Sequence, residues 1–279
     1  MAMNWNQIFA KMLDQYELRA RLFPGLLLLL PAITYVALLY GAKSPIAVGL
    51  SSVLATCGGP YFLASFVRTR GVRAQESLYR RWGGQPSTLL LRHRDMHLPQ
   101  QTKLRYHDLI AVRLGIVMPS LVDEKQNPAQ ADEAYAAAAD KLRPLTNDRK
   151  RFPFVFTELV AYGFNRNAYG SRWVGFCVAV ATMIATMLHG GVLHLYAPFL
   201  TDSSLDLAHI LVLLVSLGLS ALWCLHFTAG TTWFAGVCYA KRLWETLEEL
   251  PTRPVRTRPK RRSREESTAT PVDLKSPYT

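Results

Sequence analysis

Residues 22–40 read LFPGLLLLLPAITYVALLY, an apolar stretch with no charged side chain. A helix needs about 20 mainly apolar residues to cross the hydrocarbon core of a bilayer. Three further stretches have the same character, at residues 46–67, 173–196 and 207–240. The sequence therefore predicts an integral membrane protein with four transmembrane helices, and it excludes a soluble single-domain protein.

Short polar connections join these stretches in pairs, with residues 41–45 between the first two and residues 197–206 between the last two. Such short connections make the joined helices antiparallel neighbours. The predicted fold class is an all-α membrane protein with two transmembrane hairpins, residues 22–67 and 173–240. These hairpins flank a small, basic, α-rich cytoplasmic domain formed by residues 68–172.

The charge distribution predicts the orientation of the chain. Lys and Arg number 32 against 20 Asp and Glu, for a net charge of +12. Arg19 and Arg21 precede the first span, and Lys241 and Arg242 follow the last one, whereas the two short connections carry almost no basic residues. By the positive-inside rule, both termini and the middle domain face the cytoplasm of a bacterial inner membrane.

The two terminal segments are predicted to act at the membrane surface. Residues 1–21 have the spacing of an amphipathic helix whose apolar face includes Trp5 and Phe9. Residues 241–279 form a basic, Pro-rich tail that is predicted to be disordered and to lie against anionic lipid. Nucleic-acid binding by the tail is the less favoured alternative. In the middle domain, four basic residues are added to the surface-binding set: Lys150, Arg151, Arg166 and Arg172.

Four segments of the middle domain have a predicted secondary structure. Residues 70–81 continue out of the membrane as a helix that stops at Gly83 and Gly84. Residues 88–92 form a short strand or the start of a helix. Residues 103–118 form a helix that ends at Pro119, and a further helix starts after Asn127 and ends at Pro144.

Six residues of this domain are candidates for binding an anion, because arginine is the side chain best suited to phosphate and carboxylate groups. They are Arg80, Arg81, Arg92, His93, Arg94 and Arg105. The turn at residues 80–88 (RRWGGQPST) also predicts backbone amides that could hold a phosphate. The alternative interpretation of this turn is a simple helix stop.

No catalytic residue, metal site or cofactor is predicted. His93 and His97 have the i, i+4 spacing of zinc ligands, but no Glu follows the first His and arginines flank it. His189 and His226 lie deeper in the apolar stretches. Their role stays open between a proton or weak metal site across two helices and an ordinary interhelical hydrogen bond.

The order of hairpin, basic domain and hairpin resembles the small two- and four-span membrane effectors of prokaryotic antiphage systems. The segments RWGGQPSTLLLRHRD, NPAQADEAYAAAADKLR and YGFNRNAYGSRW resemble motifs of an uncharacterised bacterial membrane protein family. The resemblance implies a cytoplasmic part that senses a signal and helices that then disrupt the membrane. It assigns no functional residue.

Three functions follow as hypotheses. The first is an oligomeric regulated pore or membrane-perturbing effector, a homo-oligomer whose cytoplasmic domain senses an anionic signal. The second is a scaffold or accessory subunit that binds a partner protein and transports nothing. The third is a membrane-bound enzyme that acts on phosphate-containing substrates.

Overall fold

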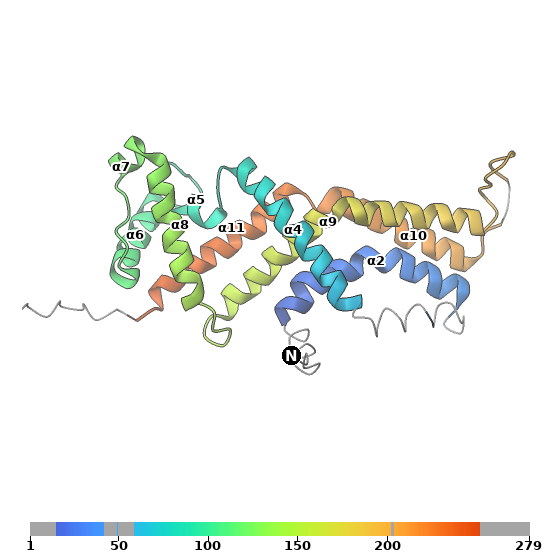
Figure 1. Ribbon diagram of the computed structural model, residues 1–279, viewed down its shortest axis with the longest axis horizontal. Helices are drawn as coiled ribbons and strands as arrows, with labels where there is room; N and C mark the ends of the chain where they lie inside the picture. Colours follow the sequence, from blue (N-terminus) through green and yellow to red (C-terminus); the bar gives the residue numbers. More distant parts are fainter. Residues whose placement is uncertain (1–14, 42–48, 50–58, 202–203, 252–279) are drawn as a thin grey trace, which may run out of the picture.

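The computed structural model describes residues 15–41, 49, 59–201 and 204–251, and within these ranges it contains helices and no β-strand. The molecule is elongated (Figure 1). At one end lies an apolar bundle, formed by residues 17–40, 173–189 and 207–226. At the other end lies a helical head, formed by residues 86–152 and 229–250. The end of the bundle opposite the head is here called the far end.

Three helices are long and apolar enough to cross a membrane: Glu17–Tyr40, Pro153–His189 and Leu207–His226. The first combines π-helix η1 (Glu17–Leu22), α2 (Phe23–Tyr35) and π-helix η2 (Val36–Tyr40). The third combines α10 (Leu207–Ala221) and π-helix η3 (Leu222–His226). Leu28, Leu219, Trp223 and Phe227 fill the space between the helices. The prediction of a helical membrane protein is confirmed at this level.

The second predicted span, residues 46–67, falls largely outside the described residues. Its described part belongs to α4 (Gly59–Trp82), which continues through the predicted helix at residues 70–81. Leu63 of α4 lies against Gly25, in the first turn of α2. The proposed N-terminal helix lies outside the described residues as far as residue 14, and both Trp5 and Phe9 belong to that part.

The third predicted span is only the second half of a much longer helix. We expected the cytoplasmic domain to end at residue 172, but α9 (Pro153–His189) runs without a break for 37 residues, or about 55 Å. The hydrogen bonds of a helix are local, so the change from polar to apolar residues near Trp173 does not end it. One helix therefore connects the head to the far end.

Two glycines let α4 and α9 cross in close contact. A Cβ atom on Gly170 would lie 2.5 Å from the backbone oxygen of Arg70, and one on Gly71 would lie 2.9 Å from the Cα of Asn167. The Asn167 side chain donates to the backbone oxygen of Ala20 over 2.7 Å. Helices α4 and α9 and the segment around Ala20 in η1, which are far apart in the sequence, thus contact one another at the start of the apolar bundle.

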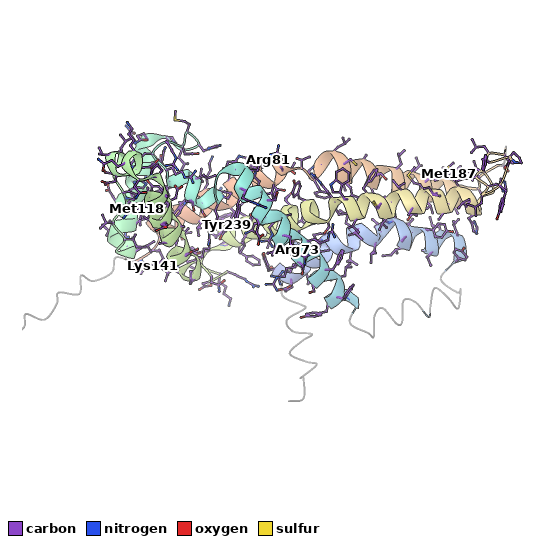
Figure 2. All side chains as sticks on the ribbon, turned by 45° about the horizontal axis from the view of Figure 1, so that its top comes forward. Arg73, Arg81, Met118, Lys141, Met187 and Tyr239 are labelled. Atoms are coloured by element: carbon purple, nitrogen blue, oxygen red, sulfur yellow. The ribbon has the colours of Figure 1, made fainter. Side chains whose placement is uncertain are left out.

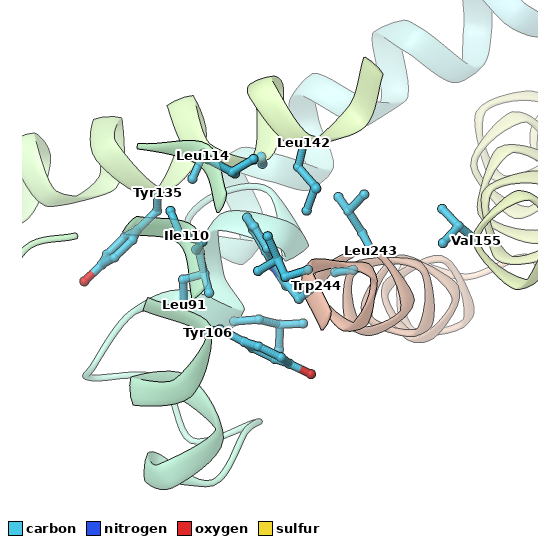
Figure 3. Packing of buried hydrophobic residues seen from close by; sticks show 14 of the residues in the cluster. Leu91, Tyr106, Ile110, Leu114, Tyr135, Leu142, Val155, Leu243 and Trp244 are labelled. Atoms are coloured by element: carbon cyan, nitrogen blue, oxygen red, sulfur yellow. The ribbon is translucent and has the colours of Figure 1, made fainter. Parts of the chain in front are cut away.

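The head consists of four helices from the middle of the chain and a fifth from its C-terminal part. The four are α5 (Pro86–Leu91), α6 (Gln100–Leu114), α7 (Leu121–Gln126) and α8 (Pro128–Leu145). The fifth, α11 (Ala229–Glu245), is followed by the 3-10 helix η4 (Thr246–Glu248). Figure 3 shows Leu243 and Trp244 of α11 directed into a core with Leu91, Ile110 and Leu142.

This arrangement corrects the expected division of the C-terminal region. We expected the last span to stop near Phe227 or shortly after, the rest of the apolar stretch as far as residue 240 to tilt, kink or run along the membrane interface, and a disordered tail from residue 241. The last apolar helix does end at His226, but α11 and η4 then pack into the head, with Ala240, Leu243 and Leu247 fully buried. The part of the tail from residue 252 onward lies outside the described residues.

The predicted helix boundaries in the head are partly confirmed. Asn127 caps α8 as predicted, because its side chain accepts a hydrogen bond from the Gln130 backbone N–H. The helix predicted for residues 103–118 ends earlier, at Leu114, because Gly115 adopts a left-handed conformation with φ of 65°. Residues 88–91 are helical, which excludes the strand alternative. Helix α7 was not predicted.

Replacing Trp244 by phenylalanine tests how α11 is held in the head. The indole Nε1 donates to the backbone oxygen of Ser87 over 3.0 Å, and the whole side chain is buried. We expect the free energy of unfolding to fall by about 1–3 kcal/mol, because the buried backbone oxygen of Ser87 loses its hydrogen-bond donor. Thermal unfolding would measure the loss. Trp173→Phe, at an exposed position of the bundle, is the control, and equal losses in both variants would contradict this assignment.

Candidate anion-binding cleft

A cleft of about 540 Å³ lies where α4 ends, α5 ends and α11 begins. Three arginines and two tryptophans contribute to its wall. The lining residues are Arg81, Trp82, Leu89, Arg92, Arg94, Asp95, His97, Ala229, Gly230 and Trp233. Figure 2 shows Arg81 at the end of α4 that faces the head, and Arg73 farther back along the same helix. Three of the six predicted anion-binding residues, Arg81, Arg92 and Arg94, are thus brought together.

Arg92 and Arg94 are already paired with carboxylates of α7 and α8. The Arg92 guanidinium binds both oxygens of Asp132, over 2.6 and 2.7 Å. Arg94 donates to Glu124 over 2.9 Å and to Asp132 over 3.2 Å. These two arginines therefore shape the wall and contribute little uncompensated charge to a ligand.

Glu124 is the centre of this network. Its carboxylate is almost fully buried and accepts hydrogen bonds from the backbone N–H of His93 and from the Tyr135 hydroxyl, both over 2.7 Å. Burial by itself would raise the pKa of Glu124. The hydrogen bonds from Tyr135, His93 and Arg94 outweigh that effect and leave the pKa below its ordinary value. The carboxylate is therefore ionised at neutral pH.

A buried lysine organises the segment that follows α5. Lys103 is 1% exposed, and its ammonium donates to the backbone oxygens of Arg92, His93 and Asp95. Three carbonyl acceptors satisfy the three donors of an ammonium group. The curvature of residues 92–95 around Lys103 places the Arg92 and Arg94 side chains at the cleft.

Arg81 differs from the other lining arginines. Within the described parts of the chain, no hydrogen bond or ion pair of its exposed guanidinium is found. The charged groups in and behind the wall are the cations Arg81, Arg92, Arg94 and Lys103 and the anions Asp95, Glu124 and Asp132. The uncompensated positive charge of this set therefore lies on Arg81.

Aromatic rings form the opposite side of the cleft. The ring centroids of Trp82 and Trp233 are 5.1 Å apart, and the His97 ring meets Trp233 edge-on at 5.4 Å. His97 donates its Nδ1 proton to Asp95, over 2.9 Å to Oδ2, which leaves Nε2 as an acceptor. The cleft thus combines one free guanidinium with flat apolar surfaces.

The remaining predicted residues lie elsewhere. Arg80 precedes Arg81 on α4 and is exposed, but it does not line the cleft. His93 lies behind the wall, with its Nε2 bonded to the Pro119 oxygen over 3.1 Å and its ring 4.8 Å from that of His107. Arg105 pairs with Glu248 over 2.8 Å on a separate surface.

The turn at residues 80–88 is a helix stop. Gly83 and Gly84 have positive φ, and their backbone N–H groups bond to the Arg80 and Tyr79 oxygens of α4. These amides are therefore not available to hold a phosphate. The hydroxyl of Ser87 accepts a hydrogen bond from Arg143.

The predicted membrane-surface residues do not lie at the same height along the axis of α9. The Arg172 guanidinium lies over the Tyr169 and Trp173 rings, at the beginning of the apolar part of α9. Arg166 donates to Gln75 over 2.6 Å nearby. Lys150 and Arg151 precede α9, about 30 Å farther along its axis from Arg172. With residues 173–189 in the bilayer, Lys150 and Arg151 are therefore far from its surface.

Comparison with known protein families, curated proteins and solved structures finds no match to this chain. The assignment of a function therefore rests on the geometry alone.

Proposed function

We propose that the chain is a homo-oligomeric membrane effector, a regulated pore or membrane-perturbing protein whose head binds an anionic ligand in the cleft. Four spans place both termini and the head in the cytoplasm of a bacterial inner membrane. The free guanidinium of Arg81 binds the anionic group of the ligand, and the Trp82 and Trp233 rings contact its flat or apolar part.

The observation that carries the proposal is the position of the cleft next to the end of an apolar helix. Ala229 and Gly230, in the first turn of α11, line the cleft, while the preceding apolar helix ends at His226. Between them, Phe227 is 2% exposed and packs against Trp223 inside the bundle. A ligand that moves the start of α11 therefore acts directly on the packing of the bundle.

The proposed topology is supported by the packing of the head. Helices α5, α6, α8 and α11 share one core, so they lie on the same side of any membrane that α9 and α10 both cross. Gly41 follows the first apolar helix at the far end, whereas Leu63 lies against Gly25 at the opposite end of that helix. This supports a second crossing between Gly41 and Leu63.

A pore would form between copies of the chain. In a single copy, Leu28, Leu219, Trp223 and Phe227 fill the interior of the bundle. The outer face of α9 carries an apolar groove of about 450 Å³, lined by Trp173, Val174, Cys177, Val178 and Ala181. Ala181 and Cys177 have small side chains that let a neighbouring helix approach closely, and the exposed Trp173 provides apolar surface beside them, which supports contact between α9 helices of neighbouring copies.

Induced expression in bacterial cells, read by a membrane-potential dye, tests this function. The full-length chain is expected to depolarise the cells, and Arg81→Ala is expected to reduce the depolarisation rate at least about tenfold, because a lost charge-assisted hydrogen bond costs about 1.5–3 kcal/mol. Arg80→Ala is the matched control, since Arg80 is also exposed but does not line the cleft.

Other outcomes contradict parts of the proposal. If Arg80→Ala and Arg81→Ala reduce the depolarisation equally, the cleft is not the sensing site. If a correctly inserted full-length chain never depolarises cells under any growth condition, the pore function is wrong, and the scaffold hypothesis is favoured.

A further inference from the structure

Two histidines join the apolar helices at the far end of the bundle. Nδ1 of His189, the last residue of α9, lies 2.9 Å from Nε2 of His209, in the first turn of α10. The Asp206 carboxylate, which caps α10, binds Nδ1 of His209 over 2.5 Å and its backbone N–H over 2.9 Å. The three residues therefore form a continuous hydrogen-bonded chain, Asp206–His209–His189.

The same histidine also contacts the first apolar helix. The His189 ring meets the rings of Tyr35 and Tyr40 edge-on, with centroids 6.3 and 5.6 Å apart. These tyrosines belong to α2 and η2, so His189 lies between all three apolar helices that the structure describes. A change at His189 therefore acts on the entire far end.

The number of protons on this pair decides whether the bond between the two rings exists. Asp206 accepts the Nδ1 proton of His209, so the neutral His209 ring has an acceptor at Nε2 and receives the Nδ1 proton of His189. One added proton keeps the bond, with Nε2–H of His209 then donating to Nδ1 of a neutral His189. A second added proton places N–H groups on both facing atoms and two positive charges side by side, and the bond is lost.

We propose that His189 and His209 form a proton-operated clasp at the far end of the apolar bundle, closed with up to one added proton and opened by the second. The clasp lies on the side of the membrane opposite the head, and its assignment does not depend on the function proposed for the cleft. Its ligand is the proton of that compartment, and its response is separation of the far ends of α2, α9 and α10.

The surroundings of the pair fit this role. Among the described residues, the titratable groups that face the two rings are Asp206 on the connection before α10 and Tyr35 and Tyr40 on the first apolar helix. The hydrogen bonds from His209 hold the pKa of the Asp206 carboxyl below its ordinary value. Asp206 therefore stays charged at mildly acidic pH and continues to accept the Nδ1 proton of His209. His189 is exposed, so protons from solution reach it.

A double-mutant cycle in the purified full-length chain tests the clasp. Thermal unfolding is measured for the unmodified chain, His189→Ala, His209→Ala and the double variant, at pH 8.0, 6.5 and 4.5, because alanine removes the hydrogen bond between the two side chains. At pH 8.0 and 6.5, we expect the change in unfolding temperature of the double variant to differ from the sum of the two single changes by about 2–4 °C. At pH 4.5, this difference should disappear or change sign. His194→Ala is the control, since His194 bonds to Thr201 rather than to the pair.

A distance measurement gives an independent result that does not depend on unfolding. Spin labels at Leu38→Cys and Leu211→Cys, both exposed positions near the far end, are introduced with the four native cysteines changed to serine. We expect the label distance to increase and broaden between pH 7.5 and 4.5. The same labels with His189→Gln should show no change, because a glutamine amide can bond to either protonation state of His209. The proposal would be overturned if the label distance in the chain that keeps His189 did not change with pH. It would also be overturned if the coupling of the unfolding temperatures were equal at all three pH values.

Discussion

Replacing Glu124 by alanine is expected to destabilise the head by about 2–5 kcal/mol, because the buried Tyr135 hydroxyl and the His93 backbone N–H lose their acceptor, and each buried donor left unsatisfied costs about 1–3 kcal/mol. Four donors converge on this carboxylate: the backbone N–H groups of His93 and Arg94, the Arg94 guanidinium and the Tyr135 hydroxyl. A loss of this size is a large part of the free energy of unfolding of a typical domain. Urea unfolding followed by tryptophan fluorescence would measure it.

Glu245→Ala is the matched control for this prediction. Glu245 also pairs with an arginine, Arg242, over 2.7 Å, but both side chains are about half exposed. Exposed pairs of this kind contribute about 0–1 kcal/mol. Comparable losses in Glu124→Ala and Glu245→Ala would show that the buried network is not what holds the cleft wall together.

The same carboxylate makes the stability of the head sensitive to acid. Because the pKa of Glu124 is lowered in the folded chain, its charged form stabilises the fold fully above the ordinary glutamate pKa, near 4.3. This contribution is lost as the pH falls through the lowered value. We therefore expect the stability difference between the unmodified chain and Glu124→Gln to shrink between about pH 5 and pH 3.

Replacing Gly170 by alanine is expected to destabilise the chain by about 1–3 kcal/mol, and valine by more, through overpacking. The added Cβ would meet the backbone oxygen of Arg70 at 2.5 Å and the backbone nitrogen of Gly71 at 2.8 Å. Backbone atoms cannot rotate away as a flexible side chain can, so α4 and α9 must separate. Thermal unfolding in detergent would measure the effect.

Gly218→Ala provides the control for the helix crossing. Gly218 also lies inside a helix, α10, but nothing lies within 4 Å of an added Cβ. Alanine is a better helix former than glycine by about 1 kcal/mol, so this variant should be unchanged or slightly more stable. If Gly170→Ala behaves like Gly218→Ala, the two helices do not cross in close contact.

The sequence predicted the helices with strong local signals. Uninterrupted apolar composition located the three helices that are long enough to cross a membrane, and Asn127 followed by Pro128 marked the start of α8. The end of α6 was missed because Gly115, rather than Pro119, stops the helix. For α9, a change in composition near Trp173 was taken as a boundary, although backbone hydrogen bonding continues through it.

The cleft was harder to predict because its parts come from distant segments. Arg81, Arg92 and Arg94 were identified from their residue type, but their carboxylate partners Glu124 and Asp132 lie on other helices. The role of α11 was missed because the apolar residues after Phe227 continue the stretch of residues 207–240, which favoured a position along the membrane interface rather than in the head. A signal existed in the spacing of Ala240, Leu243 and Leu247, which continues the apolar face beyond residue 240.

The contribution of α11 to the head also sets an order of events during synthesis. Residues 237–250 complete a core whose other members precede residue 156, and two apolar helices lie between these parts in the sequence. A ribosome must therefore translate, and the membrane must accept, both of those helices before the head can close. In a chain whose α10 does not lie beside α9, α11 cannot reach the head, and the core residues that it covers stay exposed. Folding of the head thus acts as a check on correct membrane insertion.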